Sequence, residues 1–160
     1  MYYAACDAQG VWSIVSATGQ SLSDRTLTGN TNQSSIAHFT LATRDVARSS
    51  EFFQKTLRWK PIHRPQNIDC RAAWLSISPS QELHLIEIPE FEVSPFEREF
   101  GRHFAIYYPL AGFKDLKSQL TQQGAELISP ERETPFERFF FRDPNGYLFE
   151  IVEADHAPEP

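Results

Sequence analysis

Apolar and polar residues alternate in short stretches along the chain, as they do in half-buried strands. Residues 36–41 (IAHFTL) and 102–107 (RHFAIY) both have this alternation. Each stretch contains a His-Phe pair, and His38 lies 65 residues before His103. A fixed spacing between similar stretches is the sign of an internal repeat. The chain is therefore predicted to hold two related modules.

A helical pattern follows each of these strands. The first helix is expected behind the N-cap residue Asp45, and the second runs from about Phe113 to a left-handed C-terminal cap at Gly124. Further alternating stretches lie at residues 71–77, 82–88, 138–142 and 147–153. The last two flank residues 143–146 (DPNG), whose Asn-Gly pair suits a tight hairpin turn. Each module thus reads as a strand, a helix and two or three antiparallel strands, which predicts an α+β fold.

The segments outside the modules are polar. Residues 1–35 form an expected flexible N-terminal extension because residues 16–35 carry almost no apolar side chains. Residues 11–15 within it could be a strand at a sheet edge or a fragment of an unnatural start. The linker 89–101 between module one (36–90) and module two (101–154) is too long for a simple turn and is a candidate to pack over an opening. Residues 155–160 read as a frayed C-terminal tail.

Composition narrows the function classes. The 160 residues, 41% of them hydrophobic, are enough for one ordinary domain. With a net charge of −6 and no basic cluster, we expect neither nucleic acid nor an anionic membrane as a partner. Cys6 and Cys70 lie far apart, which argues against a disulfide scaffold and against a thiolate metal site. No stretch approaches the roughly 18 apolar residues of a membrane helix, so a soluble protein of a reducing cytoplasm is expected.

Histidines and one glutamate recur at equivalent positions of the two modules. Residues two apart share a strand face, so each His-Phe strand turns its histidine away from the strongly apolar face. The repeat also matches His84, in the last strand of module one, with Glu150 in the last strand of module two. The candidate ligand set is His38, His84, His103 and Glu150. Imidazole nitrogens with one carboxylate suit Zn²⁺, Ni²⁺, Mn²⁺ or Fe²⁺, whereas Ca²⁺ would need more oxygens.

These residues resemble the vicinal oxygen chelate superfamily, which includes glyoxalase I, extradiol dioxygenases and bleomycin-resistance proteins. The resemblance covers residues 36–154, and its most specific part is FRDPNGYLFE at 141–150. It implies two βαβββ modules that form a cup-shaped half-barrel, with helices on the outer face and a metal on the inner face. It implies that His38, His103 and Glu150 are the three common ligands, that His84 falls at a fourth position, and that the protein is a homodimer.

Two positions depart from the family pattern. Arg58 stands where the family usually has a glycine after the first helix. His84 stands where bacterial glyoxalases have a carboxylate, so the usual pair of glutamates is absent. If His84 turns away from the metal, two histidines and one carboxylate remain, which is the facial arrangement of non-haem Fe²⁺ oxygenases.

Three functions are compatible with this pattern. The first is a metal-dependent lyase or isomerase, in which a small substrate chelates the ion through vicinal oxygens and Glu150 shuttles a proton. The second is an Fe²⁺ ring-cleaving dioxygenase, with Tyr107 orienting a substrate oxygen. The third is a metal-free binding protein of the bleomycin-resistance type, favoured by a cluster of phenylalanines at 136–141. Arg132 and Arg138 are candidate contacts for an anionic group of the substrate.

Overall fold

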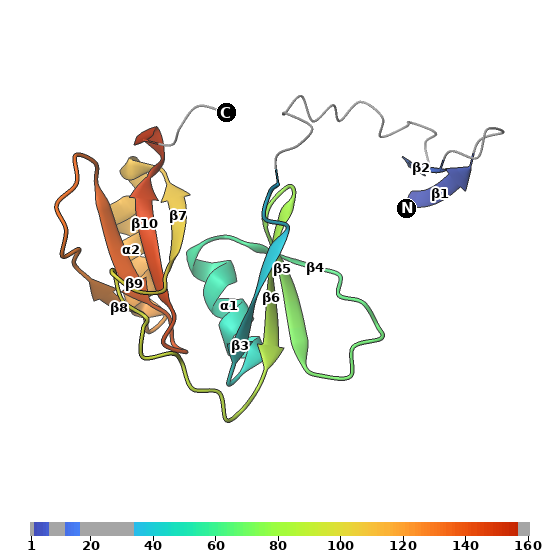
Figure 1. Cartoon of the computed structure of the whole chain (residues 1–160), viewed down its shortest axis with the longest axis horizontal. Coiled ribbons are helices and arrows are strands. Elements are labelled where there is room, and N and C mark those ends of the chain that lie inside the picture. Colours follow the sequence, from blue (N-terminus) through green and yellow to red (C-terminus); the bar gives the residue numbers. More distant parts are fainter. Residues whose placement is uncertain (1, 7–11, 17–33, 157–160) are drawn as a thin grey trace. The chain divides into compact units, whose positions relative to one another are not determined.

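The computed structural model describes residues 2–6, 12–16 and 34–156, and the chain divides into Met1–Ser35 and Ile36–Pro160. In the first unit, β1 (Tyr2–Cys6) pairs antiparallel with β2 (Trp12–Ser16), as Figure 1 shows. The strand expected near residues 11–15 therefore has its partner within its own unit. Residues 17–33, most of the expected flexible stretch, and residues 157–160 of the expected tail lie outside the described residues.

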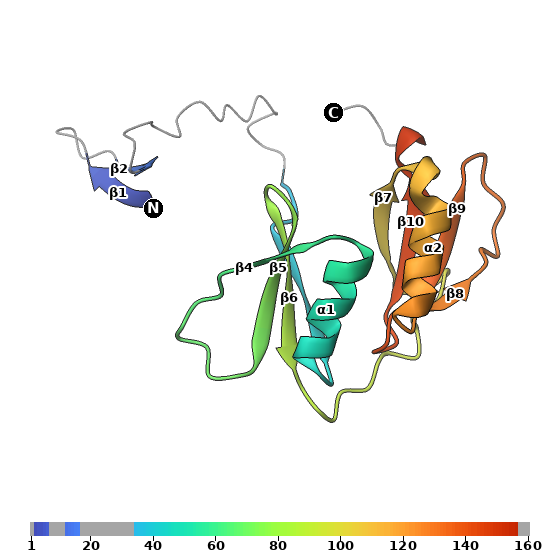
Figure 2. The same cartoon turned by 180° about the vertical axis from the view of Figure 1, so that it is seen from behind.

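The second unit contains two four-stranded sheets, each with one helix (Figures 1 and 2). The elements of module one are β3 (His38–Thr43), α1 (Val46–Thr56), β4 (Lys60–Ile62), β5 (Ala72–Ser78) and β6 (Gln81–Glu87). Those of module two are β7 (Phe104–Tyr108), α2 (Phe113–Gln122), β8 (Glu126–Ile128), β9 (Arg138–Arg142) and β10 (Leu148–Glu153). Short 3-10 turns span Leu110–Gly112 and Ala154–His156.

The two sheets have the same strand order. In module one the order is β3-β6-β5-β4, and in module two it is β7-β10-β9-β8. The first strand of each module runs parallel to the last one, and the other neighbours are antiparallel. The predicted α+β fold of two βαβββ modules is therefore confirmed, with open sheets. The third antiparallel strand of each module, β4 or β8, has only three residues, which is too short to reveal an alternation.

The ends of the helices follow from the local sequence. The Asp45 carboxylate accepts a hydrogen bond from the backbone N–H of Arg48 at 3.0 Å and so caps α1. After α1, Arg58 adopts φ 62°, the left-handed conformation that a glycine would adopt without strain. Gly124 closes α2 with φ 86°. The expected caps at both helices are thus present, and Arg58 bears the conformational cost of replacing a glycine.

One apolar core joins the two modules. Phe53 of α1 lies 5.5 Å from Phe149 of β10, measured between ring centroids, and Phe39 of β3 stacks on Phe104 of β7 at 4.8 Å. Phe52 of α1 also lies 6.2 Å from Phe141 of β9. The helix-facing sides of both sheets therefore share a core. The histidines lie on the opposite sides, because neighbouring residues of a strand point to opposite faces.

The loop between β9 and β10 contains the expected tight turn, because the N–H of Gly146 donates to the carbonyl of Asp143 at 2.9 Å. It spans five residues, 143–147, and the carboxylate of Asp143 organises it. Asp143 Oδ1 accepts hydrogen bonds from the backbone N–H groups of Asn145, Gly146 and Tyr147 at 3.0, 2.9 and 2.8 Å. Gly146 has φ 106°. The predicted tight hairpin turn at 143–146 is therefore present, and the buried Asp143 carboxylate binds the N–H groups that follow it.

The linker 89–101 packs on this loop and on β10. Phe91 stacks on Tyr147 with ring centroids 5.3 Å apart. Glu97 is buried, accepts a hydrogen bond from the N–H of Leu148 at 2.8 Å and receives the guanidinium of Arg102. These contacts anchor the linker on module two.

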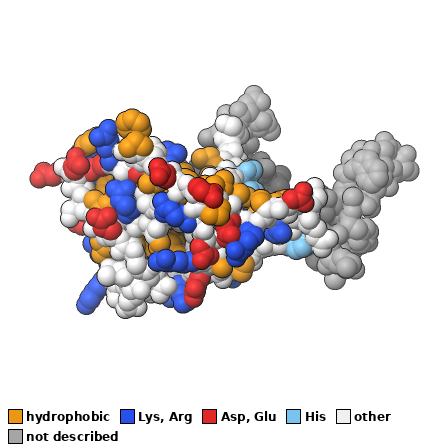
Figure 3. All heavy atoms as spheres, turned by 90° about the horizontal axis from the view of Figure 1, so that it is seen from below, with side chains coloured by type: hydrophobic (Ala, Val, Ile, Leu, Met, Phe, Trp, Pro, Cys, Tyr) orange, Lys and Arg blue, Asp and Glu red, His pale blue; other side chains and the backbone are white. Residues whose placement is uncertain are grey.

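Figure 3 shows how charged side chains are distributed on one face of the molecule. On the face seen in Figure 3, acidic and basic side chains of the described residues are interspersed. Among the described residues, no helix has the length and apolar character needed to cross a membrane.

Candidate functional site

Module one brings two of the predicted ligand residues together. His38 lies on β3 and His84 on the neighbouring strand β6, where the backbone of His84 is in register with Thr40. The two imidazole rings stack with their centroids 4.2 Å apart and their planes 14° apart. Trp74 of β5, in register with His84, stacks on it at 4.3 Å. His84 is thus held between an imidazole and an indole.

A carboxylate that the sequence analysis missed accompanies this pair. Glu82 Oε2 lies 2.9 Å from His84 Nε2, and Glu82 is in register with His38 across the two strands. The Glu82 side chain is 42% exposed, so it can reach solvent or a ligand. Its position two residues before His84, on the same strand face, was the signal available in the sequence.

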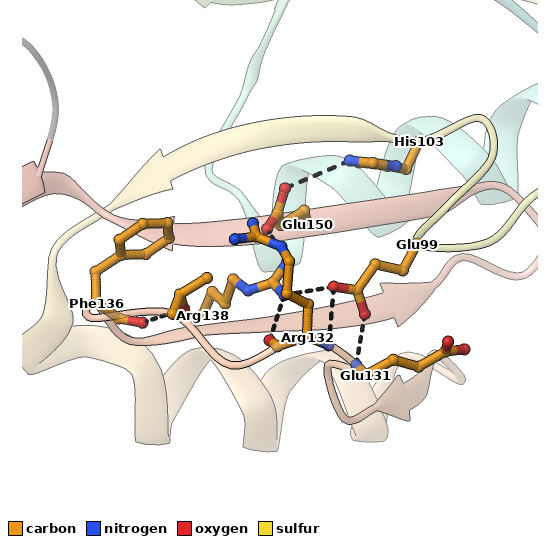
Figure 4. A network of polar contacts seen from close by, with 8 residues as sticks. Glu99, His103, Glu131, Arg132, Phe136, Arg138 and Glu150 are labelled. Atoms are coloured by element: carbon orange, nitrogen blue, oxygen red, sulfur yellow. Dashed lines mark hydrogen bonds and ion pairs between the residues drawn. The ribbon is translucent and has the colours of Figure 1, made fainter.

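Module two brings the other two predicted ligands together. Glu150 of β10 is in register with Ala105 of β7, and His103 lies two residues before Ala105 on the same face. His103 Nε2 is 3.4 Å from Glu150 Oε2. His103 Nδ1 is buried and has no hydrogen-bond partner among the described residues. The pair thus presents a nitrogen and an oxygen to the same point (Figure 4).

Arg138 of β9 binds the other oxygen of Glu150. Its Nη1 donates a hydrogen bond to Glu150 Oε1 at 2.7 Å, and its Nη2 donates to Glu99 Oε1 and to the carbonyl of Arg132 (Figure 4). The Arg138 side chain is only 3% exposed. Arg138, predicted as a substrate contact, is therefore buried between two carboxylates. Sequence analysis missed Glu99 because it lies on the linker, 39 residues away from Arg138.

The charged groups of this cluster stabilise one another in their ionised forms. Burial opposes the ionisation of Glu99, but hydrogen bonds from the N–H of Glu131 and from Arg138 outweigh it and lower the pKa of Glu99. Burial likewise opposes the charge of Arg138, yet hydrogen bonds to Glu150 and Glu99 outweigh it and raise the pKa of Arg138. One guanidinium and two carboxylates leave the cluster with one net negative charge, which favours a nearby cation.

A groove of about 850 Å³ runs along β3 and β7. Both His38 and His103 line it, together with aromatic residues of the two strands, whereas His84 and Glu150 lie outside its lining. Tyr107, predicted to orient a substrate oxygen, lines the groove and is 55% exposed. The volume is in the usual range for small-molecule sites, about 300–1,000 Å³.

The structure gathers the four predicted ligands as two pairs. His38 with His84 belongs to one sheet, and His103 with Glu150 belongs to the other. Within the part of the chain that the structure describes, no three His, Cys, Asp or Glu side chains are close enough together to hold a metal ion. We refer to His38 with His84 and to His103 with Glu150 as the half-sites of module one and module two.

The half-site of module two suits a divalent ion in its chemistry and spacing. Two ligand atoms that are each about 2.1 Å from a tetrahedral ion lie about 3.4 Å apart. That is the separation of His103 Nε2 and Glu150 Oε2, and it is too long for a good hydrogen bond. Because the donors are an imidazole nitrogen and a carboxylate oxygen, they fit Zn²⁺, Ni²⁺, Mn²⁺ or Fe²⁺.

Comparison with known proteins decides the family. The family model described as the glyoxalase/bleomycin resistance protein/dioxygenase superfamily matches residues 35–151. The chain belongs to this superfamily. The predicted resemblance is therefore confirmed, and members of the superfamily include glyoxalases and dioxygenases as well as resistance proteins.

Individual relatives are more distant. Glyoxylase I 4 of Arabidopsis thaliana is 27% identical over 128 residues, which are 78% of this chain and 73% of that protein. A mutant of the fosfomycin resistance protein FosX of Listeria monocytogenes, solved with Mn(II) and 1S,2S-dihydroxypropylphosphonic acid, has a TM-score of 0.62 at 17% identity. The match covers 76% of this chain and 92% of that one.

A glyoxylase/bleomycin resistance protein/dioxygenase domain from Frankia has a TM-score of 0.60 at 22% identity, with 76% of this chain and 98% of that chain covered. These solved structures share the fold with this chain.

Proposed function

We propose that the protein is a divalent-metal-dependent enzyme of the lyase or isomerase kind. Its substrate is a small molecule that binds the ion through two adjacent oxygens. The observation that carries the proposal is the 3.4 Å separation of His103 Nε2 and Glu150 Oε2, together with the stacked His38 and His84 pair on the other sheet. The similarity to glyoxylase I 4 of Arabidopsis supports the same class of reaction.

Two copies of the chain complete the site in this proposal. β3 and β7 are both at the end of their sheets, so each has one edge without a paired strand among the described elements. If β3 of one copy lies beside β7 of another, His38 and His84 come next to the partner copy's half-site. A free edge with backbone donors and acceptors favours such pairing. We therefore propose a homodimer with two metal sites.

The chain's own residues then have separable roles. His38, His103 and Glu150 hold the ion, and His84 is a fourth ligand or a support for His38. When bound, the ion supplies Lewis acidity toward the substrate oxygens. Glu150 would take up the substrate proton on Oε2 once the substrate oxygens displace Oε2 from the ion, because Arg138 engages Oε1. Tyr107, in the groove, contacts the substrate.

One observation favours a second candidate, an Fe²⁺ dioxygenase. Glu82 already engages His84 Nε2 at 2.9 Å, and stacking holds the His84 ring on both faces. If this arrangement persists when the ion binds, the remaining ligands are two histidines and one carboxylate, the set typical of non-haem Fe²⁺ oxygenases. The behaviour of His84 separates the two candidates.

Elemental analysis of the full-length protein, purified without added metal, is the direct test. We expect about one equivalent of Zn, Ni, Mn or Fe per chain, and loss of that metal in His38→Ala and in His103→Ala. His63→Ala is the matched control, because His63 is an exposed histidine outside both half-sites. Retention of the metal in His84→Ala would favour the dioxygenase.

Assay of the loaded protein with α-hydroxy carbonyl compounds and with catechols under oxygen then distinguishes the two chemistries. If the protein binds none of the four ions after soaking, the metal-enzyme proposal fails. A metal-free binding protein would then be the better reading.

A further inference from the structure

A buried cluster of Arg138, Glu99 and Glu150 lies beside the proposed metal site. Neither Glu99 nor Arg138 is one of the four predicted metal ligands. Arg138 is nonetheless anchored on both sides, since its Nη1 and Nη2 each donate to a different carboxylate. A guanidinium with this fork of donors fixes its partners in direction as well as in charge.

The two oxygens of Glu150 have different surroundings. Oε1 accepts the charge-assisted hydrogen bond from Arg138 at 2.7 Å, which is a strong one. Oε2 faces His103 Nε2 at 3.4 Å, without a good hydrogen bond. Only Oε2 is therefore free to meet an ion. Arg138 would oppose a geometry in which both oxygens of Glu150 bound the same ion.

Glu99 determines the charge that the ion meets. Arg138 and Glu150 alone would cancel, and a neutral pair offers little attraction to a cation. Glu99 neutralises Arg138 and leaves the charge of Glu150 available. The backbone N–H groups of Glu131 and Arg132 hold the Glu99 carboxylate in place. Because Glu99 is on the linker 89–101, the linker is connected to the half-site.

We propose that Arg138 and Glu99 are positioning residues that present Glu150 to the metal through Oε2 alone. This inference rests on the proposed metal site and adds to it the reason why a buried arginine stands beside a cation site. Groups of this kind, which hold a ligand without touching the ion, typically change metal affinity about 10–100-fold when they are lost.

The test measures Mn²⁺ binding to the metal-free full-length protein from the electron paramagnetic resonance signal of free Mn²⁺. Glu99→Gln removes a charge and keeps the shape, and Arg138→Lys keeps the charge but loses the fork of donors. We expect each variant to bind Mn²⁺ at least about tenfold more weakly than the unmodified protein.

Two matched variants control for general disturbance of the region. Glu97→Gln removes another buried carboxylate of the same linker, and Arg142→Lys changes another arginine of β9 that has hydrogen bonds to Gly146 and Glu97. Neither control residue contacts Glu150 in the interactions that the structure describes. We expect both controls to bind Mn²⁺ within about twofold of the unmodified protein.

A second readout concerns the geometry of Glu150. The infrared difference spectrum between Mn²⁺-loaded and metal-free protein distinguishes a carboxylate that binds through one oxygen from one that binds through two. We expect the one-oxygen signature in the unmodified protein and the two-oxygen signature in Arg138→Lys.

The outcomes separate the two proposals. If the unmodified protein binds no Mn²⁺, Zn²⁺, Ni²⁺ or Fe²⁺, the proposed metal site does not exist, and the proposed positioning role of Arg138 and Glu99 is overturned as well. If the protein binds Mn²⁺ and Glu99→Gln and Arg138→Lys bind it equally well, only the positioning pair is overturned. Equal weakening in the controls would also overturn it, because the effect would then be a general one.

Discussion

Thr43 at the end of β3 donates a hydrogen bond from its hydroxyl to Asn145 Oδ1 at 3.0 Å, across 102 residues of sequence. Both residues are buried. Asn145 Nδ2 also donates to Ser49 Oγ of α1 at 3.0 Å and to Asp143 Oδ2 at 3.1 Å. The asparagine of the DPNG loop therefore joins module two to the strand and helix of module one.

Asn145→Ala should lower the free energy of unfolding by about 2–4 kcal/mol, because it removes the buried hydrogen bonds that the Asn145 side chain makes with Thr43, Ser49 and Asp143. Urea denaturation followed by circular dichroism measures the change. Asn67→Ala, at an exposed asparagine, is the control and should change stability by less than about 0.5 kcal/mol. An equally small effect at Asn145 would mean that the loop does not tie the modules together.

Arg58→Gly should stabilise the protein by about 1 kcal/mol, since Arg58 has φ 62° and glycine adopts this conformation without a Cβ clash. Arg58→Ala keeps the Cβ and loses only the exposed hydrogen bond to Gln119, so its stability should hardly change. The midpoints of thermal or urea unfolding of the three proteins test this. A stabilisation shared by both variants would assign the effect to the side chain rather than to the backbone.

Asp143 should make stability fall as the pH rises above about 3.8. Burial raises the pKa of Asp143 from its ordinary value of 3.8, against the hydrogen bonds from Asn145 and the turn N–H groups. The folded state therefore binds this proton more tightly than the unfolded state does. The contribution is present below pH 3.8 and is lost as the pH rises through the raised pKa of the folded state.

The variant that isolates this term is Asp143→Asn. We measure the unfolding free energy of both proteins in urea from pH 3.5 to 7. The value for Asp143→Asn should increase relative to that of the unmodified protein as the pH rises. A constant difference between the two proteins across this range would show that Asp143 does not titrate in the folded state above its ordinary value.

Glu150→Gln should abolish turnover of the substrate, because proton transfer by a placed carboxylate contributes about 10²–10⁴-fold to rate. It should weaken metal binding less than His103→Ala does, since the amide oxygen still coordinates. Glu82→Gln is the matched variant from the other half-site. Activity close to that of the unmodified protein in Glu150→Gln, with activity lost in Glu82→Gln, would move the proton-transfer role to Glu82.

Much of the fold followed from local patterns. The strands 138–142 and the helix starting behind Asp45 were predicted where they occur, because alternation and capping are properties of neighbouring residues. The left-handed residue at 58 was predicted from the family pattern as a position for glycine, and the backbone there is indeed left-handed. The turn at 143–146 was predicted from its Asn-Gly pair, whereas the hydrogen bonds of the Asp143 carboxylate to the N–H groups of the loop were not.

The sequence alone therefore determined the two modules, the family and the pairing of His38 with His84 and of His103 with Glu150 by repeat position. Strand alternation and register are local, so the faces could be read from spacing. Only the tertiary structure placed Glu99 of the linker and Arg138 around Glu150, and it kept the two pairs in separate sheets. Contacts between residues distant in sequence depend on how whole elements pack, and no local pattern encodes that packing.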